Sequence, residues 1–126
     1  MSFSNTYETN VLTWTFTNSA VTRPTAWYIA LYTSDPGEAQ GGTEISGGSY
    51  VRQSATFTVT GDTATNSAAI EFPAASASWG NITHVAVVDA STAGTQIAYA
   101  ALTTSKTIDT GDILRIPTGD LDITLN

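Results

Sequence analysis

The feature that most constrains the fold of this chain is an alternation of apolar and small polar residues, interrupted at short intervals by turn residues. From Thr25 onward nearly every stretch has this period of two, with Gly, Pro or Asp residues between stretches. Such alternation places side chains on the two faces of a β-strand. Regular turns between short strands are typical of a sandwich or barrel. We therefore predict an all-β fold, an antiparallel and jelly-roll-like β-sandwich with about eight strands.

The best-defined strand is predicted over residues 26–33, which are apolar on both faces and therefore central in a sheet. It ends at Ser34-Asp35-Pro36-Gly37, a strong turn signal. Residues 50–60 alternate without interruption and are predicted as one strand. Further strands are predicted at residues 67–72, 82–89, 96–103, 113–116 and 121–125.

The N-terminal segment, residues 4–18, fits two structures. Tyr7, Val11 and Trp14 follow a helical spacing, and Ser4 is placed to cap such a helix. The alternation of residues 11–16 also fits the two faces of a strand. Both interpretations stand on these residues alone.

Length and charge restrict the class of protein. A chain of 126 residues is predicted to form a single β-sandwich domain over residues 1–126. Its net charge is −7, and its four basic residues are scattered, so we expect neither a nucleic-acid partner nor an acidic membrane as partner. No signal peptide or membrane-spanning apolar run is recognisable.

Few residues have the chemistry that catalysis requires. The chain has no Cys, and His84 is its one histidine, so a zinc site or a nucleophilic triad is not expected. The loop acids Asp35, Glu38 and Glu44 could bind Ca²⁺, but their spacing is not that of an EF-hand, and a solvated loop is favoured. We predict that the protein is not an enzyme and has no catalytic residue, cofactor or metal.

Aromatic residues are the main candidates for contacts with other molecules. The candidate interface residues are Trp14, Trp79, Tyr50 and Arg52. Trp79 lies in a loop of small residues and fits a core anchor and an interface contact equally well. A sugar platform formed by Trp79 and nearby Tyr residues is the alternative from another functional class.

Several segments together resemble one protein family across nearly the whole chain. The segments that carry the resemblance are residues 23–38 (RPTAWYIALYTSDPGE), 43–53 (TEISGGSYVRQ), 70–73 (IEFP), 79–84 (WGNITH), 101–107 (ALTTSKT) and 111–112 (GD). Their order and spacing resemble small virion proteins of tailed bacteriophages, often labelled "phage tail fibre protein". Capsid decoration (cement) proteins are similar short β proteins. The N-terminal segment of this family is helical, which favours a short helix here.

The resemblance implies a structural protein of the virion, made in the cytoplasm of the host bacterium. A compact chain of this size has no room for a fibre shaft, so we favour a capsid decoration protein. It would bind the major capsid protein on the exterior of the virion as a homo-oligomer and stabilise the assembled shell. A tail or tail-fibre-associated structural protein is the alternative within this class, with tail proteins as partners. A carbohydrate-binding module is the alternative outside it.

Overall fold

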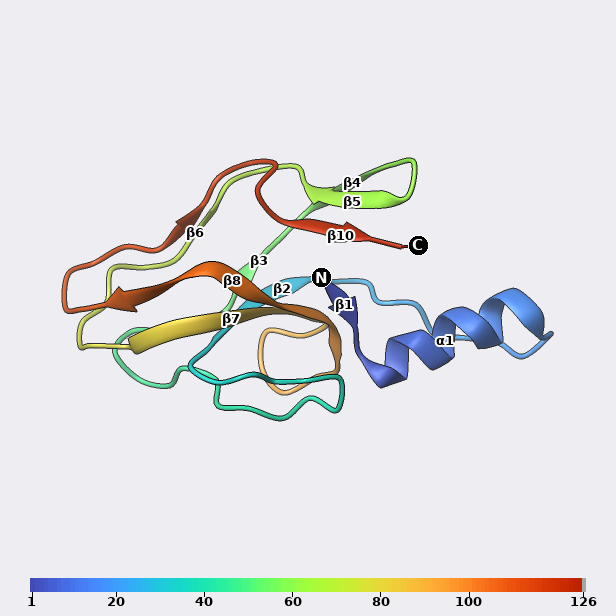
Figure 1. The fold of residues 1–126 in the computed structure, drawn as a ribbon, viewed down its shortest axis with the longest axis horizontal. Coiled ribbons are helices and arrows are strands. Elements are labelled where there is room, and N and C mark those ends of the chain that lie inside the picture. The colour runs from blue at the N-terminus through green and yellow to red at the C-terminus, as the bar shows by residue number, and fades with distance from the viewer. Residues whose placement is uncertain (126) are drawn as a thin grey trace.

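The computed structural model describes residues 1–125, and these form a mostly antiparallel β structure with one short N-terminal helix (Figure 1). The elements are β1 (Ser2–Phe3), α1 (Asn5–Phe16), β2 (Tyr28–Tyr32), β3 (Gln53–Ser54), β4 (Phe57–Thr60), β5 (Thr63–Asn66), β6 (Ile70–Glu71), β7 (Gly80–Val88), β8 (Gln96–Ile108), β9 (Arg115–Ile116) and β10 (Asp122–Thr124). The predicted all-β, sandwich-like fold is confirmed, with about ten strands in place of about eight.

The larger sheet has the strand order β1-β8-β7-β2-β3, and its longest pairing is that of the hairpin β7–β8. A second sheet, β10-β5-β4, lies over one end of the first, and the short pair β6–β9 lies over the other (Figure 1). All of these pairs are antiparallel. The strand predicted at residues 26–33 is β2, which is paired on both sides and buried on both faces.

The single strand predicted over residues 50–60 is wrong. The chain forms β3, leaves the larger sheet at Ala55 and enters the second sheet as β4. Ala55 is buried, and its N–H donates to the carbonyl of Trp27 at 2.9 Å. Residue types alternate without a break through this crossover, so a period of two does not mark the change of sheet.

The core lies between the larger sheet and the two smaller ones. Its fully buried large side chains include Ile29, Leu31, Phe72, Ile82 and Val87. Apolar residues from β2 and β7 thus meet those from the segments around β6, β9 and β10. Burial of this apolar surface is the main source of stability for a domain of this kind.

The N-terminal segment is helical, as the resemblance favoured. Ser4 is the N-cap of α1, and its hydroxyl accepts a hydrogen bond from the N–H of Tyr7. The helix ends at Phe16, and residues 17–27 lead back to the three sheets without regular structure. We call these sheets and the loops between them the body. No helix among residues 1–125 is long and apolar enough to cross a membrane.

Candidate interface at the helix arm

Of the four candidate interface residues, the structure leaves only Trp14 largely exposed. Trp14 lies on α1 and is 73% exposed, whereas Trp79 is 5% exposed. Tyr50 and Arg52 are partly buried and are engaged within the chain. These three residues lie close together in the body, while Trp14 belongs to the projecting helix.

Trp79 is a core anchor, which decides between the two interpretations left open by its sequence position. Its ring packs edge-on against Tyr50 and Phe72, with centroid distances of 5.5 and 6.3 Å. Its Nε1–H donates to the carbonyl of Gly48 at 2.8 Å. A sugar platform needs an open ring face, so the buried Trp79 cannot supply the carbohydrate site considered above.

Tyr50 and Arg52 hold loops together. The hydroxyl of Tyr50 donates to Glu44 Oε2 at 2.7 Å and accepts the N–H of Leu31 at 3.0 Å. Arg52 binds both carboxylate oxygens of Glu44 and also donates to the carbonyls of Ala90 and Ala93. The pKa of the Tyr50 hydroxyl lies far above its usual value, and burial is the largest cause of this rise. These groups are committed to internal bonds.

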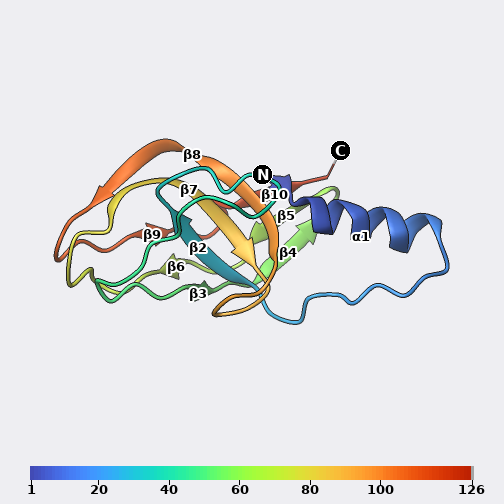
Figure 2. The ribbon, with the colours of Figure 1, turned by 90° about the horizontal axis from the view of Figure 1, so that it is seen from below.

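The helix α1 projects away from the sheets (Figure 2). None of its residues is buried, although it carries three large apolar side chains, Leu12, Trp14 and Phe16, which are 58%, 73% and 77% exposed. Figure 2 shows that only its first turn meets the body and that the chain returns alongside it. We call residues 5–24, the helix and the returning segment, the arm.

The base of the arm is fixed by several hydrogen bonds. The N–H of Ser4 donates to the carbonyl of Ile97, and the N–H of Asn5 donates to that of Glu38, at 2.9 and 3.0 Å. The Ser4 hydroxyl, 2% exposed, donates to the carbonyl of Gln96. Because these bonds join the first turn to β8 and to the loop after β2, the helix leaves the body in a defined direction.

Beyond its base, α1 has little to stabilise it within one chain. Its twelve residues include four Thr and one Val, which are weak helix formers, and it contains no Ala. Isolated helices shorter than about 12–15 residues are marginal in water, and most gain stability by packing an apolar face. The apolar side chains of α1 are instead exposed, which is typical of a surface that another molecule covers.

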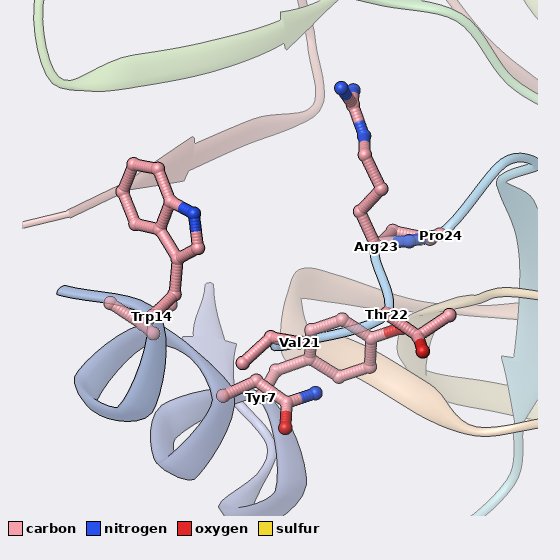
Figure 3. Close-up of a pocket in the computed structure, with 8 residues that line it drawn as sticks. Tyr7, Trp14, Val21, Thr22, Arg23 and Pro24 are labelled. Carbon is pink, nitrogen blue, oxygen red and sulfur yellow. The ribbon is translucent and has the colours of Figure 1, made fainter. Parts of the chain in front are cut away.

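A groove of about 330 Å³ lies between the helix and the returning segment (Figure 3). The helix contributes Tyr7, Val11 and Trp14, and the returning segment contributes Val21 and Arg23. In Figure 3 the side chains of Trp14 and Arg23 extend on either side of the groove, above Tyr7 and Val21. Pro24, whose predecessor is restricted to extended conformations, continues this wall.

A second concavity of about 490 Å³ opens between the larger sheet and β10-β5-β4. Apolar residues line it, among them Phe3, Trp27 and Val59, and Arg23 lies at its edge as well as at the groove. The groove and this concavity therefore form neighbouring parts of one apolar region around the base of the arm.

The arm is also the neutral part of an acidic chain. Residues 1–27 contain one acidic side chain, Glu8, and one basic side chain, Arg23, so the net side-chain charge of −7 comes from the residues beyond them. Two acids from later in the chain lie beside the base of the arm: Asp89 accepts a hydrogen bond from the Tyr7 hydroxyl at 3.4 Å, and Asp62 lines the second concavity.

The remaining chemical candidates do not form a site among residues 1–125. No group of three His, Cys, Asp or Glu side chains there could hold a metal ion. Glu44 is engaged by Arg52, and Asp35 accepts the N–H of Gly37 at 2.8 Å. His84 Nδ1 is 2.8 Å from the hydroxyl of Thr83, and its Nε2 is 3.8 Å from Asp35.

Sequence reasoning did not single out Leu12, Phe16 and Arg23, which are exposed on the arm or line its groove. Leu12 and Phe16 lie within residues 11–16, whose alternation also fits a strand and there places both on one face. Their spacing of four residues, which places them on one side of a helix, is the signal that could have found them. Nothing in the sequence marks Arg23 as the edge of a groove.

The fold and the arm define a small β protein with an exposed apolar helix. Residues 2–124 match the family model described as podophage GP4 fiber I protein gp80. The chain belongs to this family, and it is a structural protein of a bacteriophage virion. A search of curated proteins found no match.

Proposed function

We propose that this chain is a non-enzymatic subunit of a virion fibre and that it attaches to neighbouring proteins through the arm. The printed description of its family names a fibre protein. The observation that carries the attachment site is α1 itself, which exposes Leu12, Trp14 and Phe16 and buries none of its residues. Such a helix gains stability when a partner covers it.

The body supports this role as a rigid platform. Ordered loops are tied down by Trp79 and Arg52, and the base of the arm is bonded to β8. A helix held in a fixed direction loses less conformational freedom on docking than a flexible segment does.

Incorporation into particles tests this proposal. Phages whose own copy of the gene is deleted would be complemented with the wild-type chain, with the double variant Leu12→Glu/Phe16→Glu, or with Ile113→Asn. Ile113 is 53% exposed and lies outside the arm, so its replacement shows the effect of losing one exposed apolar side chain elsewhere on the surface. We expect the arm variant to be missing from purified virions and the control to be present. Normal incorporation of the arm variant would contradict an attachment through α1.

Capsid decoration, with the major capsid protein as partner on the virion exterior, is the second candidate. It is favoured by the compact β body, because residues 1–125 contain one twelve-residue helix and no extended shaft. The two candidates differ in copy number and place. A fibre subunit should occur in a few copies on the tail, whereas a decoration protein should occupy the icosahedral positions of the shell. Quantification of the chain in virions, with a particle map, distinguishes them.

A further inference from the structure

One side of α1 carries a charged and apolar stripe. Glu8, Leu12 and Phe16 follow each other at intervals of four residues and therefore lie on the same side of the helix. All three are exposed. We call these residues the stripe.

A different side of the same helix faces the groove. At about 100° per residue, Trp14 lies roughly 200° around the axis from Leu12. The groove combines apolar side chains with one cation, that of Arg23. Arg23 has no ion-pair partner within 4 Å among residues 1–125.

We propose that the stripe of one copy of this chain docks into the groove of a second copy. This inference rests on the proposed function, since it names the partner of the attachment site in the arm. The two surfaces are complementary in chemistry: Leu12 and Phe16 supply apolar side chains, and the groove supplies apolar walls. Glu8 supplies the acid that the exposed Arg23 lacks.

Charge favours a second copy over another partner surface. Glu8 and Arg23 are the only charged side chains in residues 1–27, and each complements the other. Apart from Glu8 and Arg23, the residues of the stripe and those that line the groove are uncharged, so docking the one on the other places no like charges directly together. Opposite charges at the edge of such a contact fix its register.

The arrangement of the two surfaces determines the type of assembly. A helix cannot present the stripe and the groove to the same neighbouring helix, because they lie on different sides of it. The contact is therefore heterologous, and each copy uses its stripe on one neighbour and its groove on another. Repetition of such a contact produces a closed ring or a filament, in contrast to a two-fold dimer.

Light scattering of the purified full chain during size-exclusion chromatography tests this arrangement. We expect wild-type assemblies larger than a dimer, with a mass that depends on concentration. Leu12→Glu/Phe16→Glu should weaken assembly by more than about a hundredfold, since two large apolar side chains are no longer buried. Ile113→Asn should assemble as the wild type does. A wild-type chain that stays monomeric, or that stops at a dimer, would overturn the proposal.

Charge exchange tests the register. Glu8→Arg and Arg23→Glu should each weaken assembly by about fivefold, the loss expected for an exposed ion pair. The double variant Glu8→Arg/Arg23→Glu should recover most of it, because the opposite charges meet again. If the double variant does not recover assembly, Glu8 and Arg23 of neighbouring copies do not contact each other, which would count against the proposed docking.

Mixing two variants tests the heterologous contact directly. Leu12→Glu/Phe16→Glu retains an intact groove, and Trp14→Ser/Arg23→Glu retains the apolar residues of the stripe. Each should be monomeric alone, and an equimolar mixture should form a one-to-one dimer that grows no further. Circular dichroism of each variant verifies that the β body is folded. A mixture that remains monomeric while both variants are folded would contradict the proposal.

The inference and the proposed function fail in different ways. If the isolated chain is monomeric but the stripe variant is lost from virions, the arm binds another virion protein, and only the inference fails. If the chain assembles through the stripe but the stripe variant is still incorporated, the attachment proposed for the virion fails instead.

Discussion

Arg52 and Glu44 form a two-pronged ion pair, with Nε–Oε2 and Nη2–Oε1 distances of 2.8 Å each. The Arg52 side chain is 8% exposed, and its Nη1 donates to the carbonyls of Ala90 and Ala93 at 2.8 Å each. The Arg52 guanidinium thus joins three segments: the loop after β2, the residues just before β3 and the turn between β7 and β8.

Replacement of Arg52 by Met should lower the free energy of unfolding by about 2 kcal/mol, because charged hydrogen bonds are lost and Glu44 is left half-buried without its partner. Urea unfolding followed by circular dichroism measures this change. Arg115→Met is the matched control. Arg115 is exposed and 4.0 Å from Glu71, so its loss should change stability by less than about 0.5 kcal/mol. Equal effects of the two substitutions would contradict this role of Arg52.

The same ion pair makes the free energy of unfolding depend on pH. Burial acts to raise the pKa of Glu44, but the hydrogen bonds from Arg52 and Tyr50 and the charge of Arg52 outweigh it, and the pKa lies below its ordinary value of 4.5. A carboxylate with a lowered pKa in the folded state stabilises the protein above the unfolded pKa, and this contribution is lost as pH falls through the folded pKa. Glu44→Gln should therefore show a shallower loss of stability than the wild type below about pH 5. Identical pH profiles would rule out this contribution.

Trp79→Ala should destabilise the protein by about 3–5 kcal/mol, since it removes a large buried ring from the core. Trp14→Ala is the control with the same change of side chain, and at 73% exposure it should shift the free energy of unfolding by less than about 0.5 kcal/mol. Both are measured by denaturation monitored with circular dichroism at a concentration where the chain is monomeric. A large effect of Trp14 on monomer stability would show that the arm packs on its own body.

Ser4→Ala should loosen the arm at its base. The substitution removes the N-cap and the bond to the carbonyl of Gln96, and loss of an N-cap costs about 1 kcal/mol. Amide hydrogen exchange in residues 7–16 should become faster, while exchange in β7 should change little. Ser19→Ala, at an exposed position in the returning segment, is expected to leave both unchanged. Unaltered exchange in α1 of the Ser4 variant would show that the cap does not hold the helix.

Asn66→Ala should cost about 3 kcal/mol, because several buried hydrogen bonds are lost at once. The side chain of Asn66 is 1% exposed, donates to the carbonyls of Ala68 and Pro117, and accepts the N–H groups of Gly119 and Leu121. Asn81→Ala is the control, since exposed Asn81 accepts one long bond of 3.4 Å from Thr107. Thermal unfolding of the two variants provides the comparison.

Alternation and turn residues were sufficient to predict the all-β class and the central strands of the larger sheet, because they report locally on which side chains face a core. The strands predicted at residues 26–33, 82–89 and 96–103 correspond to β2, to β7 and to the first part of β8. The strand β5 was missed because Thr63–Asn66 contains no large apolar residue. Its pairing with β4 and β10 depends on its neighbours in space, which no local pattern records.

The exposure of the candidate interface residues was predicted less well, for a related reason. Exposure of an aromatic residue depends on what packs against it in space, and the sequence next to Trp14 (Thr13, Thr15) and next to Trp79 (Ser78, Gly80) consists of small residues in both cases. Gly48 permits the close approach that buries Trp79: a Cβ atom there would lie 2.8 Å from the indole Nε1. Nothing near residue 79 in the sequence indicates this contact with residue 48.

The joint at the base of the arm has a consequence for how such proteins diversify. Gln96 donates to the carbonyl of Gly37, and Gln40 in turn accepts the N–H of Gln96, so the loop after β2 helps to determine where Ser4 sits. Substitutions in this loop could tilt the helix relative to the sheets while its outer surface keeps the same residues. If the arm docks as proposed, related chains would in this way present the same exposed side chains to a partner at a different angle to the sheets.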